Sequence, residues 1–252
     1  MPFRVFSRPR VLVLFSKSVC CLILAFAGLT ASGDAFARGE GIEGRNATAG
    51  GVAFPFGPSL SASGWKAVNF PRRRPVKFTA RGKDTLVVET TGGAGLLWRS
   101  APATIANPSK AQWRWRKIQG VGPTDLTRKG GDDRVLALYF AFADPKDVKA
   151  GTDLTSLLKR GRGDVLMYVW GGAGTRGTVL KLPYFNGRGR TIMTRAANTK
   201  PGVWFEESAS LRADFKRAFG RTPGRLVAVA VSSDADDTGG RNIAALADLY
   251  VQ

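Results

Sequence analysis

The sequence predicts an all-β protein, a jelly-roll-like β-sandwich with one amphipathic helix. Short runs of apolar and β-branched residues recur along the chain, several alternate with period two, and glycine-rich turns separate them. This pattern is typical of sandwiches and barrels built from many short strands. We expect the domain over residues 64–252, after a signal peptide (1–37) and a flexible leader (38–63).

The first 37 residues are typical of an export signal. Four basic residues lie among the first 17, the apolar run 19–29 follows, and Ala35 and Ala37 supply the small residues before a cleavage site. The run is shorter than the roughly 20 apolar residues that span a bilayer. We therefore expect a periplasmic or secreted protein, with a retained N-terminal anchor as the alternative. Cys20 and Cys21 both lie in this run, so the mature chain would contain no cysteine.

The charge composition narrows the function classes. The chain has 38 Lys and Arg against 19 Asp and Glu, a net charge of +19, and no histidine. Without histidine, Ser-His-Asp and Cys-His catalysis and His-ligated zinc are excluded. Because the basic residues are scattered and the protein is expected to be exported, we predict no nucleic-acid partner. An anionic glycan or a membrane surface fits the charge better.

Strands are predicted wherever apolar or alternating runs meet turn residues. In 111–118, Trp113 and Trp115 fall on one face of the strand. A short helix is predicted at 153–159 and an amphipathic one at 210–219, with Ser210 as N-cap and Gly220 beyond its end. The predicted strands before the final segment are 76–80, 85–90, 95–99, 111–118, 134–143, 165–170, 178–182, 191–195 and 203–207.

The final segment contains two apolar runs, 226–231 and 243–251, on either side of an acidic turn. We predict that these runs pair as strands. Asp234, Asp236 and Asp237 in the turn begin like a calcium loop, since oxygen ligands at such spacing suit calcium. A loop of the EF-hand type would need a glutamate where Ala245 stands. The turn is therefore either a solvated hairpin or a calcium site, and calcium is the one cofactor that we consider.

A set of short aromatic, acidic and glycine-containing segments recurs along the chain in a fixed order. It includes Trp113–Trp115, Lys129–Asp133, Tyr168–Trp170, Gly202–Trp204, Ala213–Gly220 and Asp234–Gly239. Together these segments resemble a bacterial family known as domain of unknown function 3047. The resemblance covers residues 64–251 and implies an exported, sandwich-like protein without an established activity. It also implies that Ala137, Ala209, Ser210 and Asp237 replace polar residues usual in the family, so a family pocket would lose two or three donors here.

Carboxylates next to strands are candidates for acid–base work on a sugar. Glycosidases need two carboxyl groups about 5–5.5 Å or 6.5–9.5 Å apart. Asp132 or Asp133 could form such a pair with Glu207 from another strand. The alternative is a salt bridge with one of the many basic residues.

Aromatic residues are candidates for stacking against sugar rings. We select Tyr139, Tyr168, Trp170 and Trp204, and expect partial exposure of Trp170 because glycines follow it. Tryptophans at period-two positions more often fill a core. We therefore expect at least three of the five tryptophans after Trp65 to be in the core.

Together these features predict an exported, non-enzymatic β-sandwich that binds an anionic or neutral saccharide of the cell envelope or its surroundings. One alternative is a polysaccharide lyase or glycosidase that uses Tyr139 or Tyr168 with Glu207 or Asp133. The other is a structural protein of the envelope. The sequence leaves the ligand and the oligomeric state open.

Overall fold

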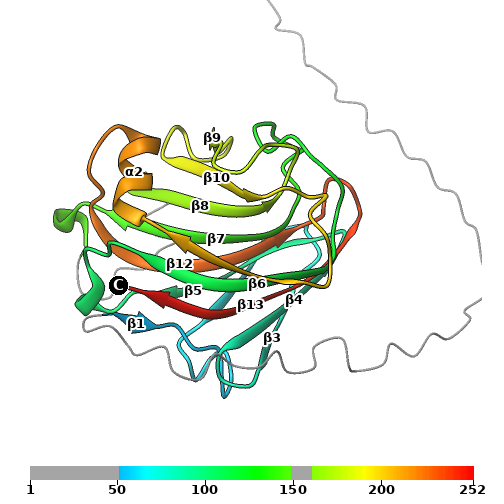
Figure 1. Ribbon diagram of the computed structural model, residues 1–252, viewed down its shortest axis with the longest axis horizontal. Helices are drawn as coiled ribbons and strands as arrows, with labels where there is room; N and C mark the ends of the chain where they lie inside the picture. Colours follow the sequence, from blue (N-terminus) through cyan, green and yellow to red (C-terminus); the bar gives the residue numbers. More distant parts are fainter. Residues whose placement is uncertain (1–50, 149–160) are drawn as a thin grey trace, which may run out of the picture. The chain divides into compact units, whose positions relative to one another are not determined.

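A computed structural model describes residues 51–148 and 161–252 and contains two β-sheets packed face to face (Figure 1). The predicted signal peptide and the predicted helix at 153–159 lie outside the described residues. The six-stranded sheet has the order β11 (Trp204–Ala209), β6 (Ala111–Gln119), β13 (Arg241–Val251), β4 (Thr85–Thr91) and β3 (Lys77–Arg81), and β1 (Val52–Ala53) pairs with β13.

The seven-stranded sheet is the one that shapes the candidate site. Its pairs are antiparallel except for β8 and β10, which are parallel. Most of its strands lie within two or three residues of their predicted positions. Their order is β2 (Lys66–Asn69), β5 (Ala94–Ser100), β12 (Arg225–Asp234), β7 (Arg134–Ala143), β8 (Gly163–Gly171), β10 (Gly189–Arg195) and β9 (Val179–Lys181).

Alternation along β7 separates two apolar clusters. Leu138 and Phe140 belong to the main core between the sheets, whereas Ala137 and Ala141 belong to a second cluster on the opposite face of the seven-stranded sheet. The period of two therefore buries both faces of this strand. The prediction for the tryptophans is confirmed, since Trp98, Trp113, Trp115 and Trp170 are all buried.

The amphipathic helix is confirmed as α2 (Leu211–Phe219). Leu211 and Phe215, four residues apart, are buried against the main core. Gly220 ends the helix with a φ of 73°, and its N–H donates to the carbonyl of Lys216. Ser210 is the N-cap residue, as predicted, but its side chain makes no capping hydrogen bond. Among the described residues, no helix is long and apolar enough to cross a membrane.

The predicted flexible leader is wrong for residues 51–63. Phe54 and Phe56 are buried, Phe56 stacks on Trp65 with ring centroids 4.9 Å apart, and β1 pairs with β13. A two-residue strand is too short to show alternation, which is why the sequence pattern missed it.

The predicted pairing of the last two strands is also wrong. β12 pairs with β5 and β7 in the seven-stranded sheet, whereas β13 pairs with β4 and β6 in the other. The acidic turn therefore crosses from one sheet to the other instead of closing a hairpin. Sequence alternation predicts strands, but it does not assign them to a sheet.

Candidate functional site

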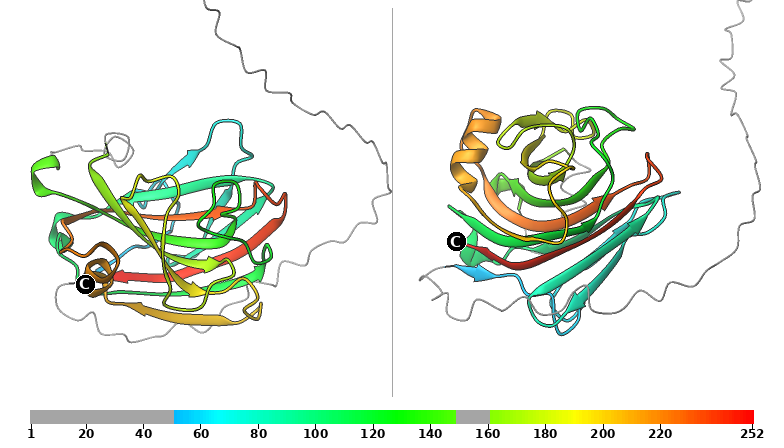
Figure 2. Two further views of the ribbon diagram at one scale, coloured as in Figure 1. Left: turned by 90° about the horizontal axis from the view of Figure 1, so that it is seen from above. Right: turned by 45° about the vertical axis from the view of Figure 1, so that its right-hand side comes forward.

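The outer face of the seven-stranded sheet contains a groove of about 930 Å³. Its lining comes from both edges of the sheet, β2 on one side and the segment after β9 on the other, because the sheet curves around it (Figure 2). The small side chains of Ala141, Ala228 and Ala230 line it where the central strands β7 and β12 lie side by side. Alanine at these positions leaves room that a larger apolar residue would fill.

Two exposed aromatic side chains line this groove. Phe70, just after β2, is 41% exposed, and Tyr184, after β9, is 55% exposed. The Tyr184 hydroxyl accepts a hydrogen bond from the Gly130 N–H at 3.1 Å and donates to Asp132 Oδ1 at 3.3 Å. The Lys129 ammonium lies 5.7 Å from its ring centroid. The ring of Tyr184 is therefore exposed but held in place.

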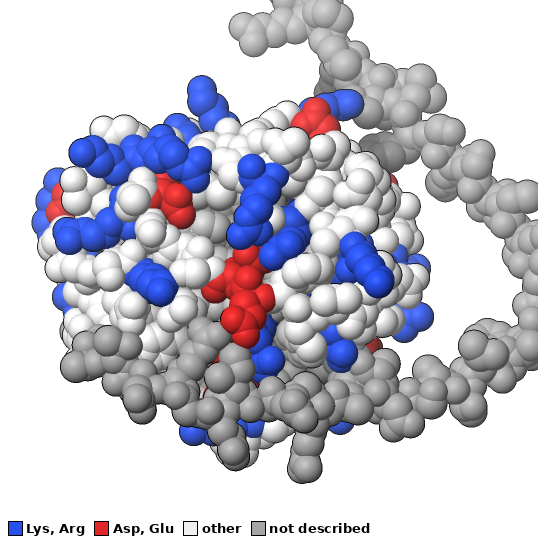
Figure 3. Space-filling model, viewed as in Figure 1, with Lys and Arg blue, Asp and Glu red and all other residues white. Residues whose placement is uncertain are grey.

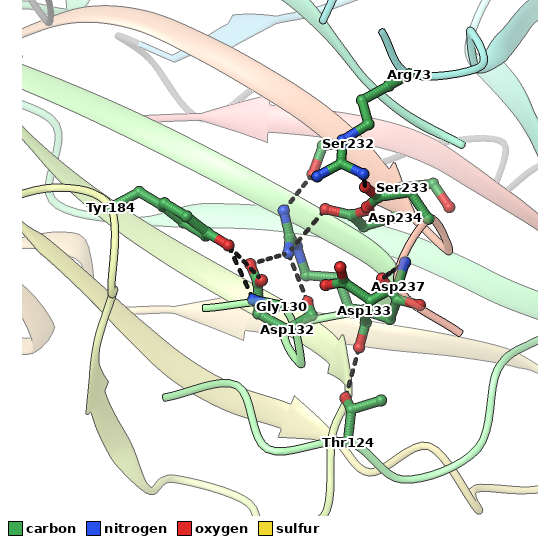
Figure 4. A network of polar contacts seen from close by, with 12 residues as sticks. Arg73, Thr124, Gly130, Asp132, Asp133, Tyr184, Ser232, Ser233, Asp234 and Asp237 are labelled. Carbon is green, nitrogen blue, oxygen red and sulfur yellow. Dashed lines mark hydrogen bonds and ion pairs between the residues drawn. The ribbon is translucent and has the colours of Figure 1, made fainter. Parts of the chain in front are cut away.

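Figure 4 shows a polar part of the groove with Asp132, Asp234 and Tyr184. It centres on Arg134, at the start of β7. Its Nη1 contacts Asp132 Oδ2 at 3.1 Å and Asp234 Oδ2 at 3.4 Å, and its Nη2 donates to the Tyr139 hydroxyl at 3.0 Å. That hydroxyl lies 2.8 Å from Ser232 Oγ. Arg134 is only 8% exposed, and its Nε has no hydrogen-bond partner among the described residues.

Burial and charge shift the pKa values of this cluster. Burial raises the pKa of Asp234 to about 8; the Arg134 charge opposes this shift, while Asp236 and Asp132 add to it. Burial alone would lower the pKa of Arg134, but Tyr139, Asp234 and Asp132 raise it above its ordinary value. Burial and the neighbouring carboxylates also raise the pKa of Asp237. Asp234 and Asp237 therefore lose their protons at a higher pH than an ordinary aspartate does.

The acidic turn is anchored by Asp133, which is fully buried. Asp133 Oδ2 accepts hydrogen bonds from the N–H and the hydroxyl of Thr238 at 2.8 and 2.6 Å, and its Oδ1 accepts one from the Asp237 N–H at 3.3 Å. The buried Asn242 amide donates to the carbonyls of Arg134 and Asp234. These side chains tie the turn to the start of β7 and so position the carboxylates of the groove.

The calcium prediction concerned Asp234, Asp236 and Asp237. Oxygens of Asp133, Asp234 and Asp236 lie within 4.8 Å of one another, whereas Asp237 is exposed and outside this group. Asp236 is paired with Arg73 at 2.5 Å, Asp234 with Arg134, and Asp133 with the turn amides. A cation would therefore compete with two arginines, and calcium binding stays a prediction.

A known protein family matches most of the chain. The model of the family described as "Protein of unknown function (DUF3047)" matches residues 63–250. The chain belongs to this family. No curated protein matches the DUF3047 chain.

Solved structures similar to the DUF3047 chain have low identity to it. The xyloglucanase domain of NopAA, a type three effector from Sinorhizobium fredii solved with cellobiose, is 8% identical over 75% of this chain and 92% of that chain, with a TM-score of 0.41. A thermostable cellulase derived from Cel12A of Rhodothermus marinus is 14% identical over 76% and 94%, with a TM-score of 0.43. Endoglucanase 3 of Trichoderma harzianum, from family GH12, is 9% identical over 71% and 82%, with a TM-score of 0.33. No activity of the DUF3047 chain follows from these similarities.

Of the predicted ligand-binding residues, Asp132 and Tyr139 line the groove, and Asp133 supports it from behind. Tyr168 and Glu207 line a different cavity of about 120 Å³ near α2. Glu207 accepts hydrogen bonds from Trp115 Nε1 at 3.0 Å, Arg176 at 2.7 Å and Arg195 at 2.6 Å. The alternative that we gave for Glu207, a salt bridge with basic residues, is therefore the one found, and no pair with Asp132 or Asp133 forms.

The expected exposure of Trp170 is wrong, because its side chain is fully buried in the main core of the DUF3047 chain. Trp204 lies on β11 of the six-stranded sheet, against Arg114 and Arg116. Neither tryptophan lines the groove. Both were selected by residue type, which does not indicate the sheet face.

Five charged or aromatic residues that line the groove of the DUF3047 chain were missed from the sequence: Phe70, Arg73, Arg134, Tyr184 and Phe185. Phe70 and Arg73 lie beside Pro71 in a segment without periodicity, and Tyr184 lies in a glycine- and proline-containing connection. The run Lys129–Asp133 of the family pattern ends one residue before Arg134. Its position next to this run was the one sequence feature that could have indicated Arg134 as a groove residue.

Proposed function

We propose that this chain binds a neutral saccharide in the groove of the seven-stranded sheet. One observation carries the proposal. Among the described residues, only three large hydrophobic side chains are exposed, and two of them, Phe70 and Tyr184, line this groove. Aromatic rings present an apolar face that suits the C–H face of a sugar ring, and the Tyr184 hydroxyl is already bonded to the protein.

The polar part of the groove supplies the hydrogen-bonding groups that such a ligand needs. Asp132, Asp234, Asp236 and Asp237 line it together with Arg73 and Arg134, so carboxylates outnumber arginines. This charge favours a neutral saccharide over the anionic one that the net charge of +19 also allowed. Figure 3 shows Lys and Arg spread widely over the face of the molecule that it draws, with acidic side chains among them.

Binding can be measured by isothermal titration with cello-, xylo-, manno- and malto-oligosaccharides. Tyr184→Ala and Phe70→Ala are each expected to weaken binding about tenfold, the effect of losing roughly 1.4 kcal/mol of stacking. Val203→Ala is the matched control, because Val203 is 40% exposed and outside the groove. Equal losses in all three variants would refute the assignment, and no binding to any saccharide would favour a structural role in the envelope.

The proposed ligand belongs to the cell envelope or the extracellular space, since the first 37 residues are typical of an export signal. N-terminal sequencing of the protein purified from its own cells tests this location. Cleavage after Ala37 would leave Arg38 as the first residue. An intact N-terminus in the membrane fraction would instead indicate a retained anchor.

A further inference from the structure

We infer that the saccharide bound in the groove carries a linear alkyl chain, and that the groove holds the sugar at one end and the chain at the other. The inference rests on the proposed function, because the sugar and its chain must occupy the same groove. It deepens that function by naming the class of ligand, a neutral glycoside with an alkyl aglycone.

The hydrogen-bonding side chains of the groove gather at one end of it. Arg134 stands at the start of β7, and its register partner Asp234 stands at the end of β12. Tyr184 belongs to the same end, because its hydroxyl is bonded to Asp132 and to the Gly130 N–H. These groups can bond the hydroxyls of a sugar.

The exposed ring of Phe70 belongs to this polar end as well. Phe70 directly follows Asn69, the last residue of β2. Asn69 pairs with Gly95, and Gly95 pairs with Ser233. Ser233 precedes Asp234 on β12. The two aromatic residues that we assign to the sugar therefore lie at the end of the groove that contains the polar groups.

The other end of the groove is apolar. Ala141 lies near the opposite end of β7 from Arg134, roughly 20 Å away along an extended strand. Ala141 pairs with Ala228 of β12 on one side and with Val165 of β8 on the other. Paired residues of neighbouring strands face the same side of a sheet, and all three line the groove. Of the side chains that the structure describes, none able to hydrogen-bond lines the groove in this row.

A sugar ring suits this apolar end poorly. Its hydroxyls would lose hydrogen bonds to water there without gaining any from side chains, which costs free energy. The backbone offers little replacement, because β7 and β12 are paired on both sides and use their N–H and C=O groups within the sheet. An alkyl chain has no such groups to satisfy, and its burial against alanine and valine is favourable.

The size and the shape of the groove fit such an amphiphilic ligand. Ligand pockets usually measure about 300–1,000 Å³, and this groove of about 930 Å³ lies at the upper end of that range. Leu96 and Phe185 also line it and pack against the second apolar cluster. Because the sheet curves around the groove, a flexible chain can follow its floor (Figure 2).

Isothermal titration with a series of alkyl glycosides tests the inference. The probes are methyl, butyl, hexyl and octyl glycosides of glucose, mannose and xylose, each used below the concentration at which it forms micelles. For the sugar that binds, the dissociation constant of the wild type should fall about fourfold with each added methylene, the effect of burying that group. Hexanol, which has the chain without the sugar, should bind much more weakly than the hexyl glycoside.

A larger side chain at the apolar end should remove this dependence on chain length. In Ala141→Leu, the ratio of the dissociation constants of the methyl and hexyl glycosides should fall close to one. Ala228→Leu fills the same end and is the second variant if circular dichroism shows that the first does not fold. Ala213→Leu is the matched control, because it makes the same substitution at an exposed position of α2 outside the groove. Tyr184→Ala, at the polar end, should weaken every glycoside of the series by a similar factor.

Each outcome decides a different point. Equal affinity for all chain lengths, with sugar binding intact, would overturn the alkyl chain and leave the proposed function standing. Absence of binding by every oligosaccharide and glycoside would overturn both. Hexanol that binds as tightly as the hexyl glycoside would show that the sugar contributes nothing, which also overturns both. A gain with chain length that persists in Ala141→Leu and Ala228→Leu would overturn the placement of the chain.

Discussion

At the residue scale, the protonation of Asp234 is the property of the groove that is easiest to measure. Its pKa is raised to about 8 in the folded protein, whereas an unperturbed aspartate has a pKa near 3.9. The folded state therefore holds this proton over a pH range in which the unfolded chain has lost it. The free energy of unfolding should fall as the pH rises from about 4 to about 8.

We expect Asp234→Asn to remove much of that decline, because asparagine does not titrate and its amide can still donate to Asp236. Thermal unfolding across this pH range measures the effect. The wild type should lose stability with rising pH, and the variant should have a flatter profile. Parallel profiles would mean that Asp234 is ionised in the folded protein at neutral pH.

Thermal unfolding with added calcium tests whether a cation can compete with the arginines of the groove for Asp234 and Asp236. Because Arg73 and Arg134 already contact Asp236 and Asp234, calcium should change the unfolding midpoint of the wild type by less than about 1 °C. In Arg73→Ala, which frees Asp236, calcium should raise the midpoint. A rise in the wild type that Asp236→Ala abolishes would establish a calcium site.

At the scale of elements, the acidic turn between β12 and β13 joins the two sheets. A segment that crosses between sheets has no ladder of its own, so side chains must satisfy its N–H and C=O groups. Asp133 and Asn242 do this, and they lie on opposite sides of the turn in the sequence. Local sequence therefore predicts a turn rich in aspartate but not the residues that hold it.

Asp133→Ala should lower the free energy of unfolding by about 3 kcal/mol, since it removes a buried acceptor from two amides and a hydroxyl. Denaturation in urea measures the change. Asp125→Ala is the control, because Asp125 is exposed and its carboxylate accepts hydrogen bonds from nearby Thr127. Similar losses in both variants would contradict the anchoring role of Asp133.

Strands and sites differ in how far the sequence predicts them. Alternation located β6 and β7 closely, because burial of a strand face imposes a period of two. The groove needs residues from β2, β7, β12 and the segment after β9, which are distant in sequence. Asp132 and Asp234 were found as carboxylates beside apolar runs, and Tyr139 was found as an aromatic residue of a predicted strand. Arg134 and Tyr184 were missed, because their roles depend on contacts across the sheet.

At the scale of the whole molecule, a strongly basic chain contains a groove in which aspartates predominate. The chain carries a net charge of +19, yet four aspartates and two arginines line the groove. Binding of an anionic polymer by the basic residues and binding of a neutral saccharide in the groove should therefore differ in their response to salt.

Retention on an anionic polymer such as polygalacturonate should weaken as salt rises, because screening shortens the Debye length from about 10 Å at 0.1 M to about 3 Å at 1 M. Titration with the neutral oligosaccharide that binds best should change little over the same range. If both decline together, the neutral ligand is bound by the charged surface and not by the groove.

The parallel pairing of β8 with β10 has one more consequence. Parallel neighbours require a long connection, and here residues 172–188 supply it, with the edge strand β9 and Tyr184 inside it. One wall of the groove is thus built on a segment whose length the topology demands. Pairing of β9 with β10 and burial of Leu182 attach this segment to the sheet, whereas Tyr184 stays exposed. A substitution at Tyr184 should therefore alter what the groove recognises without disturbing the sheet.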